Sequence, residues 1–398
     1  MLARFPRRPG LTLVGAVALV IAIANPAAAP PGDLDPTFDG DGKVTTDLAG
    51  SFEIAGAVAI QGDGKIVAAG TAADVSGISD FALARYNADG SLDPTFSGDG
   101  KVTTDFAGAS DEANAISIQG DGKIVAAGVA RIGLNGSQDF ALARYNANGS
   151  LDTTFSGDGK VTTDFAGAND QAHAVAIQGD GKIVAAGVAG DVVSGTNDFG
   201  LARYNANGSL DTTFDGDLLL PVPGDGKVTT DFAETTDQAF GVAIQGDGKI
   251  VAAGFAGSDF ALARYNADGS LDTAFDGDGK VTTDFAGSGS RDEAHAVAIQ
   301  GDGKIVAAGL AVVSGVFDFA LARYNADGSL DTIFSGDGKV TTDFAGDFDA
   351  AHGVAIQANR RIVAAGFADL PGTGFDFALA RYTCLRRTSR PTSIPTCP

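Results

Sequence analysis

A repeat of about 59 residues is the feature that most restricts what this chain can fold into. The string ARYN, or a close copy of it, places an arginine at positions 85, 144, 203, 264, 323 and 381. The string TTD also recurs six times, with Asp at 47, 105, 164, 231, 284 and 343, and GDGKI recurs in five copies, with Arg361 in place of its lysine in the sixth. A period of this length indicates one supersecondary unit stacked upon the next. Six copies fill the chain behind its N-terminal segment and leave no room for a second domain.

Each copy is expected to form four strands, as the copy in residues 171–232 illustrates. The apolar runs HAVAIQ and KIVAAG flank a Gly-Asp-Gly turn, in which glycine supplies the positive φ that such a turn needs. The run DFGLARY and the run KVTTDF follow, and no stretch has helical periodicity over three turns. Four antiparallel strands repeated six times predict an all-β fold, a six-bladed β-propeller of four-stranded blades.

The two ends of the repeat region carry incomplete copies. A fourth-strand motif stands first, at residues 43–48, and a third-strand motif stands last, at residues 376–382. We therefore expect these two segments to pair and complete the last blade, which would leave no open sheet edge. The propeller is predicted to span residues 30–383.

The segments outside the propeller differ from it in composition. Residues 1–29 have three arginines, an uncharged apolar run at 11–24 and small residues at the end, the order of a secretory signal peptide. That run is too short to span a bilayer comfortably, so we expect a secreted, extracellular or periplasmic protein with no membrane span after signal removal. Residues 384–398 form a short basic tail rich in Pro and Thr, in which Cys384 and Cys397 either close a small loop or stay unpaired.

Charge limits the choice of partner. The chain has 27 basic and 50 acidic residues and a formal net charge of −23. Nucleic-acid binding needs clustered Lys and Arg to neutralise phosphates, so the sequence argues against nucleic acid. We expect a monomer.

The combined motifs resemble a known family. The succession LDPTF, GDGKVTTDF, AVAIQGDGKIVAAG and DFALARYNADGS, present in nearly all of residues 33–383, resembles the delta-60 repeat of secreted bacterial proteins. The strand order is also similar to that of NHL-repeat propellers. The resemblance implies a β-propeller of unknown function and export from the cell, and it supplies no catalytic residues.

Residues that every copy repeats are interpreted as structural. The DGDG strings are read as glycine turns capped by Asp, because their oxygen ligands are too few for a calcium loop. The Arg of ALARY and the Asp of TTD and DF are read as a ring of structural ion pairs or hydrogen bonds. Most phenylalanines recur at three repeat positions and are read as packing residues.

Residues that break the repeat are the candidates for a site. An acid precedes the first strand of each copy, and three residues later the copies differ, with a histidine in three of them. We expect both sets to ring one mouth of the central channel, where they would bind a polar ligand or a metal: His173, His295, His352, Asp111, Asp170, Asp292 and Asp349. Imidazole with carboxylate suits Zn²⁺, and acids alone suit Ca²⁺. The alternative is that these are solvated loop residues without a ligand.

Two functions follow from these patterns. The first is a secreted binding or scaffold protein that presents one loop-lined face to an extracellular or cell-surface macromolecule. The alternative is a metal-dependent hydrolase or lyase with its site at the channel mouth, an expectation by analogy of fold. No serine–histidine–acid, paired-carboxylate or phosphate-loop motif accompanies the repeat.

Overall fold

The computed structural model describes residues 34–383 apart from 49, 133–135, 166, 192–194, 217–223, 234–235, 288, 345–347 and 371–373. The predicted signal peptide, the C-terminal tail and its two cysteines lie outside the described residues. The described chain contains no helix that is long and apolar enough to cross a membrane.

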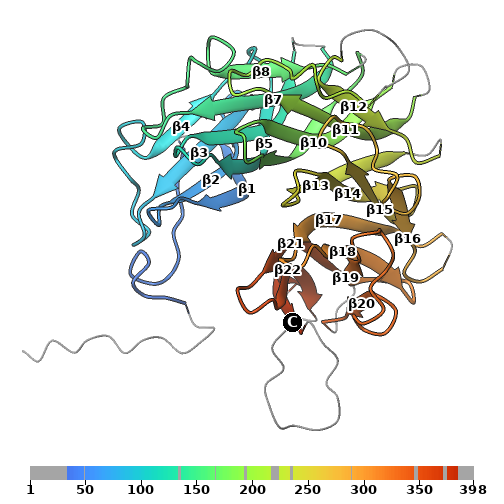
Figure 1. Cartoon of the computed structure of the whole chain (residues 1–398). Helices are drawn as coiled ribbons and strands as arrows, with labels where there is room; N and C mark the ends of the chain where they lie inside the picture. The colour runs from blue at the N-terminus through green and yellow to red at the C-terminus, as the bar shows by residue number, and fades with distance from the viewer. Residues whose placement is uncertain are drawn as a thin grey trace, which may run out of the picture.

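The chain folds into a six-bladed β-propeller of antiparallel sheets, as the repeat predicts. Figure 1 shows the blades following one another around an arc, with the first strand of each toward the centre. Five sheets have four strands in sequential order and the sixth has three. The strands, blade by blade, are β1 (Phe52–Ile60), β2 (Ile66–Ala73), β3 (Ser79–Tyr86) and β4 (Lys101–Thr104); β5 (Asp111–Ile118), β6 (Ile124–Arg131), β7 (Gln138–Tyr145) and β8 (Lys160–Thr163); β9 (Gln171–Ile177), β10 (Ile183–Gly190), β11 (Asn197–Tyr204) and β12 (Lys227–Thr230); β13 (Asp237–Ile244), β14 (Ile250–Ala256), β15 (Asp259–Tyr265) and β16 (Lys280–Thr283); β17 (Asp292–Ile299), β18 (Ile305–Val313), β19 (Val316–Tyr324) and β20 (Lys339–Thr342); β21 (Asp349–Ile356), β22 (Ile362–Leu370) and β23 (Gly374–Tyr382).

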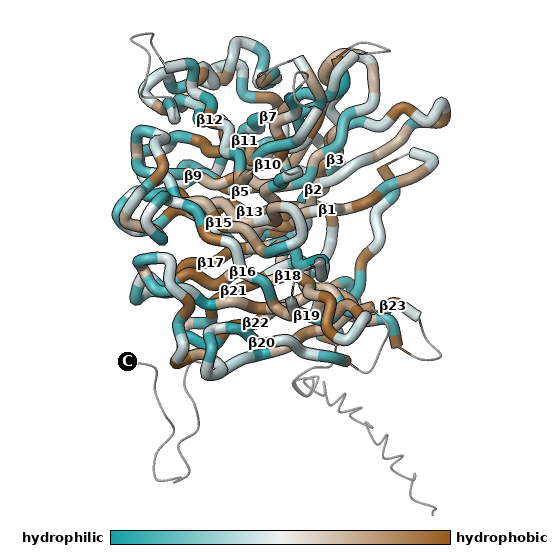
Figure 2. The backbone as a smooth tube through the Cα atoms, turned by 90° about the vertical axis from the view of Figure 1, so that its right-hand side faces the viewer, coloured by the Kyte–Doolittle hydropathy of each residue, from teal (hydrophilic) through white to brown (hydrophobic). Residues whose placement is uncertain are grey.

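Glycine turns join the strands where the sequence places them. In blade 3, Gly181 has a φ of 87°, and the Gln178 amide donates to the Lys182 carbonyl oxygen at 2.8 Å to close the hairpin. The DGDG strings are turns as well, since the Lys43 amide donates to Asp41 Oδ1 at 2.9 Å. Figure 2 shows the resulting alternation of hydrophobic strands with hydrophilic turns.

The core lies between blades. Phe140 and Leu142 of β7 are fully buried and pack against Ile183 and Tyr204 of the next blade. Each side chain of this kind contributes about 1.5–3 kcal/mol when it is buried. A single blade has no such partner, so stability comes from stacking.

A buried ion pair also recurs in the blades, with a partner that differs from the one expected. Arg144 Nε donates to Asp152 Oδ2 at 2.8 Å, and both side chains are about 95% buried, with 4% and 5% exposed. The Arg144 Nη1 donates to the carbonyl oxygen of Ala206 in the next blade, and the guanidinium lies over the Phe155 ring. The partner is therefore the Asp of the LDTTF motif, and the Asp residues of TTD and DF have another place in the fold.

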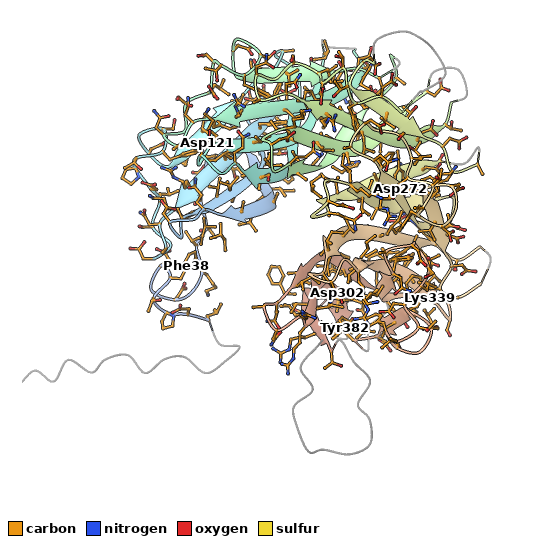
Figure 3. All side chains as sticks on the ribbon, viewed as in Figure 1. Phe38, Asp121, Asp272, Asp302, Lys339 and Tyr382 are labelled. Atoms are coloured by element: carbon orange, nitrogen blue, oxygen red, sulfur yellow. The ribbon has the colours of Figure 1, made fainter. Side chains whose placement is uncertain are left out.

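The predicted pairing of residues 43–48 with 376–382 is not formed in this structure. The described residues of the sixth sheet make only β21, β22 and β23. Residues 43–48 are held on the other side of the opening, where the Tyr86 hydroxyl donates to Thr46 Oγ1 at 2.8 Å. Figure 3 shows Phe38 and Tyr382 on the two sides of this opening. Closure of the ring stays a prediction.

Candidate functional site

Each innermost strand carries one β-bulge, and the bulge falls on the position where the copies differ. In β9 the pairing with β10 shifts between Ala172 and Ala174, so His173 is the extra residue. The same shift flanks the corresponding residue in the other first strands, namely Gly56, Asn114, Phe240, His295 and His352. A bulge turns its extra side chain away from the regular pleat. The bulge therefore falls at the same repeat position of all six first strands, where the copies carry Gly, Asn, Phe or His.

The bulge side chains of successive blades touch one another. The rings of His173 and Phe240 have their centroids 5.2 Å apart, and Phe240 meets His295 edge-on at 5.3 Å. The rings of His295 and His352 stack at 4.7 Å with an angle of 17°. In blade 2, Asn114 Nδ2 donates to the Ala172 carbonyl oxygen at 3.0 Å. The structure therefore gathers the three predicted histidines into one row.

Phenylalanines that depart from the repeat extend this row, and sequence reasoning missed them. Phe255 contacts Phe240 at 5.9 Å, and Phe367 contacts His352 at 5.5 Å. Phe367 in turn meets Phe375 at 5.1 Å. We call the connected rings the aromatic belt, which consists of His173, Phe240, Phe255, His295, His352, Phe317, Phe348, Phe367 and Phe375. The signal was present in the sequence, because these phenylalanines stand at repeat positions where most copies carry another residue.

The histidines of the belt differ in electrostatic environment. Burial lowers the pKa of His173 to about 4, so this ring is neutral at pH 7. Burial and the neighbouring His295 also lower the pKa of His352. The Glu293 carboxylate accepts a hydrogen bond from His295 Nε2 at 3.1 Å and also binds Arg291, and His295 Nδ1 is buried without a hydrogen-bond partner. The belt therefore offers flat apolar faces together with imidazole groups that can donate or accept.

The predicted acids lie at or just before the start of the first strands, in buried positions that do not face solvent. Asp111, Asp170, Asp292 and Asp349 are all fully buried. Each accepts a hydrogen bond from the backbone of the preceding turn, as Asp170 Oδ2 does from the Phe165 amide at 2.7 Å. Burial raises the pKa of Asp111 and of Asp170 to about 6, with a further contribution from nearby aspartates.

Of the residues that the structure describes, the predicted histidines and the predicted acids do not come together in a group of three that could hold a metal ion. Among the described residues, the groups of His, Cys, Asp and Glu close enough to share an ion consist of aspartates alone. The expected combination of imidazole with carboxylate around Zn²⁺ therefore has no geometric support in the described part of the chain. The aspartate groups are a separate feature of the fold.

The fold and the repeated blade contacts define this chain as a β-propeller repeat protein. The sequence model of the family described as "Domain of unknown function (DUF5122) beta-propeller" matches one segment in each of the first five blades: residues 61–96, 119–155, 178–214, 245–275 and 300–334. This match supports membership of a β-propeller repeat family, while the more specific resemblance to the delta-60 repeat stays a prediction. No curated protein matches the sequence.

Several solved structures are similar in fold. A protein of unknown function from Dyadobacter fermentans has 13% identity and a TM-score of 0.46, with 82% of this chain and 93% of that chain covered. A protein from Lactobacillus plantarum has 13% identity and a TM-score of 0.46, with 84% and 85% covered. The α-L-arabinofuranosidase Arb93A from Fusarium graminearum has 8% identity and a TM-score of 0.49, with 82% and 92% covered. Similarity at this level carries no argument about activity.

Proposed function

We propose that this chain is an exported binding protein whose aromatic belt holds an uncharged polysaccharide of the cell surface or its surroundings. The observation that supports the proposal is the row of bulges, because the bulges of four successive blades bring the rings of His173, Phe240, His295 and His352 into one connected row. A purely structural position would be expected to repeat like its neighbours.

The chemistry of the belt favours an uncharged chain. Aromatic side chains offer large rigid contact areas at a low cost in conformational entropy, and histidines add hydrogen bonds that fix orientation. The formal net charge of −23 disfavours an anionic partner. The belt crosses several blades, so an extended ligand can contact more rings than a small one.

Binding to a panel of neutral polysaccharides, measured by affinity electrophoresis and calorimetry, tests this function. We expect at least one to bind, and we expect Phe375→Ala and His352→Ala to weaken the binding about tenfold or more. Both side chains are exposed, so the variants should fold. Ile333→Ala, which removes an exposed apolar side chain outside the belt, is the matched control. A panel without binding, or equal binding by all variants, would contradict the proposal.

A second candidate, an enzyme at the same mouth, is favoured by the Glu293–His295 pair. A carboxylate that accepts from one ring nitrogen orients the imidazole, which is how acid–base pairs are arranged in many enzymes. For the metal-dependent hydrolase or lyase, the test is the metal content of the purified protein, measured by mass spectrometry. Stoichiometric metal that is lost in both His295→Ala and His352→Ala would favour the enzyme, and a metal-free protein would count against it.

A further inference from the structure

Groups of three aspartates recur in the first five blades, apart from the aromatic belt. In each group, one carboxylate oxygen per residue lies within 4.8 Å of the others. The members are the Asp of DF on the third strand, the Asp of TTD after the fourth strand, and the acid that starts the first strand of the next blade. We call these groups the Asp triads: Asp80, Asp105 and Asp111; Asp139, Asp164 and Asp170; Asp198, Asp231 and Asp237; Asp259, Asp284 and Asp292; Asp318, Asp343 and Asp349.

One member of the last triad is buried with no partner of its own. Asp318 is 6% exposed, and its Oδ1 has no hydrogen-bond partner in the described structure. Its carboxylate nevertheless lies beside those of Asp343 and Asp349. Buried polar atoms normally have a partner, and three carboxylates this close repel one another when all are ionised. A cation between the oxygens would supply both the partner that Asp318 Oδ1 lacks and the opposite charge.

The third member of each triad is fixed in place by the backbone. Asp349 Oδ2 accepts a hydrogen bond from the Phe344 amide at 2.7 Å, and Asp111 Oδ2 accepts one from the Phe106 amide at the same distance. Hydrogen bonds of this kind orient a carboxylate before a ligand arrives. The site is thus held by the turn between one blade and the next.

We propose that each Asp triad binds a divalent cation, and that the cation is Ca²⁺. The donor atoms are all carboxylate oxygens, which are the ligands of hard cations and not those that select Zn²⁺. Ca²⁺ accepts the irregular geometry of three aspartates completed by water, whereas Mg²⁺ requires a near-ideal octahedron. Affinities on the order of 10⁻⁴–10⁻³ M are typical of extracellular calcium modules.

The cation would tie two blades together, which is a role separate from the proposed binding function. Two of its ligands come from one blade, on the third strand and just after the fourth, and the third lies at the start of the next blade.

Calorimetric titration of the EDTA-treated full chain with CaCl₂ near pH 7.5 tests the proposal. We expect at least five Ca²⁺ ions per chain, a thermal midpoint that rises with calcium, and much weaker binding of Mg²⁺. Asp318→Asn and Asp343→Asn should each lower the stoichiometry by one ion. Two variants are used because Asp318 is buried and its replacement could disturb packing. Asp343 is exposed, so its replacement leaves the buried packing intact.

The matched control is Asp337→Asn, which makes the same charge change in an exposed turn between β19 and β20. It should leave the number of bound ions unchanged. The absence of bound calcium at millimolar CaCl₂ would overturn the proposal. A stoichiometry that neither triad variant lowers would overturn it as well.

Discussion

The faces on the two sides of the opening have the residues of the two halves of a blade interface, and this leads to a test of ring closure. Phe377 of β23 is 99% exposed and Leu379 is 65% exposed. Their counterparts in blade 5, Phe319 and Leu321, are fully buried. Across the opening, Ile60 of β1 is 71% exposed, although the same repeat position is partly buried in the other blades.

The free energy available from closure can be estimated from these side chains. Burial of a Phe or Leu is worth about 1.5–3 kcal/mol, so Phe377 and Leu379 together would contribute about 3–6 kcal/mol. The pairing of residues 43–48 with β23 would in addition remove an unpaired sheet edge. We therefore expect the ring to close in solution through these two segments.

The perturbation that tests this is Phe377→Ala, compared with Phe319→Ala. In a closed ring both substitutions remove a buried ring and should each lower the free energy of unfolding by about 3–5 kcal/mol. In an open ring Phe377 has nothing to pack against, and its replacement should change stability by less than about 0.5 kcal/mol. Urea unfolding followed by far-UV circular dichroism measures both values.

The refuting result is a neutral Phe377→Ala beside a strongly destabilised Phe319→Ala. Sedimentation of the wild-type chain at increasing concentration gives a second check. An open ring would expose two complementary faces that can pair between copies, so concentration-dependent association would also contradict closure within one chain.

Two further predictions concern single blades. Asp152→Asn leaves Arg144 buried without its charge partner and should cost about 3–5 kcal/mol, whereas Asp121→Asn at an exposed turn should cost less than about 0.5 kcal/mol in the same urea titration. Burial alone would raise the pKa of Asp152, but hydrogen bonds and the Arg144 charge lower it to about 2. The ionised Asp152 carboxylate therefore contributes to the free energy of unfolding above about pH 4, and this contribution is lost as the pH falls through about 2. Acid unfolding followed by circular dichroism should begin at a higher pH in Asp152→Asn than in the wild-type chain. Gly128→Ala should prevent or strongly weaken folding, because the new Cβ would overlap a backbone carbonyl oxygen at the bulge. Gly120→Ala should be tolerated, because the space around Gly120 is open. Soluble yield and thermal midpoint of the two variants measure the difference.

Local patterns allowed most of the fold to be predicted from the sequence. The turn glycines and the short apolar runs act over a few residues, so the strands fall where the repeat places them. Pairing between the chain ends depends on segments more than 300 residues apart, and no local signal determines it. The partner of Arg144 was missed for a related reason, because several recurring aspartates compete for each arginine and only the folded register selects Asp152.

The candidate site was predicted in part. The histidines stood out because they interrupt a repeat, and the bulges do bring them together. The acids were placed at the channel mouth because they were predicted to lie in loops. The structure instead places Asp349 at the start of β21, where its carboxylate accepts a backbone hydrogen bond, and sequence spacing does not reveal this. The phenylalanines of the belt were missed because all phenylalanines were interpreted together as packing residues. Only those at positions where most copies carry another residue, such as Phe367, indicate the site.

The repeat pattern links ring closure to the proposed cation sites. By their repeat positions, Asp47, Glu53 and Asp376 correspond to the three members of an Asp triad, and closure through residues 43–48 and β23 would bring them together. A calcium ion at this place would join the first and last blades. We therefore expect six ions per chain if the ring closes and five if it stays open.

Glu53→Gln distinguishes these two cases. In a closed ring it should lower the calcium stoichiometry by one and reduce the calcium-dependent rise in thermal midpoint, because the seam between the chain ends is the one blade interface without a covalent connection. In an open ring Glu53 belongs to no complete triad, so the substitution should change neither quantity. If the wild-type chain binds six ions and Glu53→Gln also binds six, the sixth ion does not lie between the first and last blades. That result would contradict the proposed connection between ring closure and the sixth calcium site.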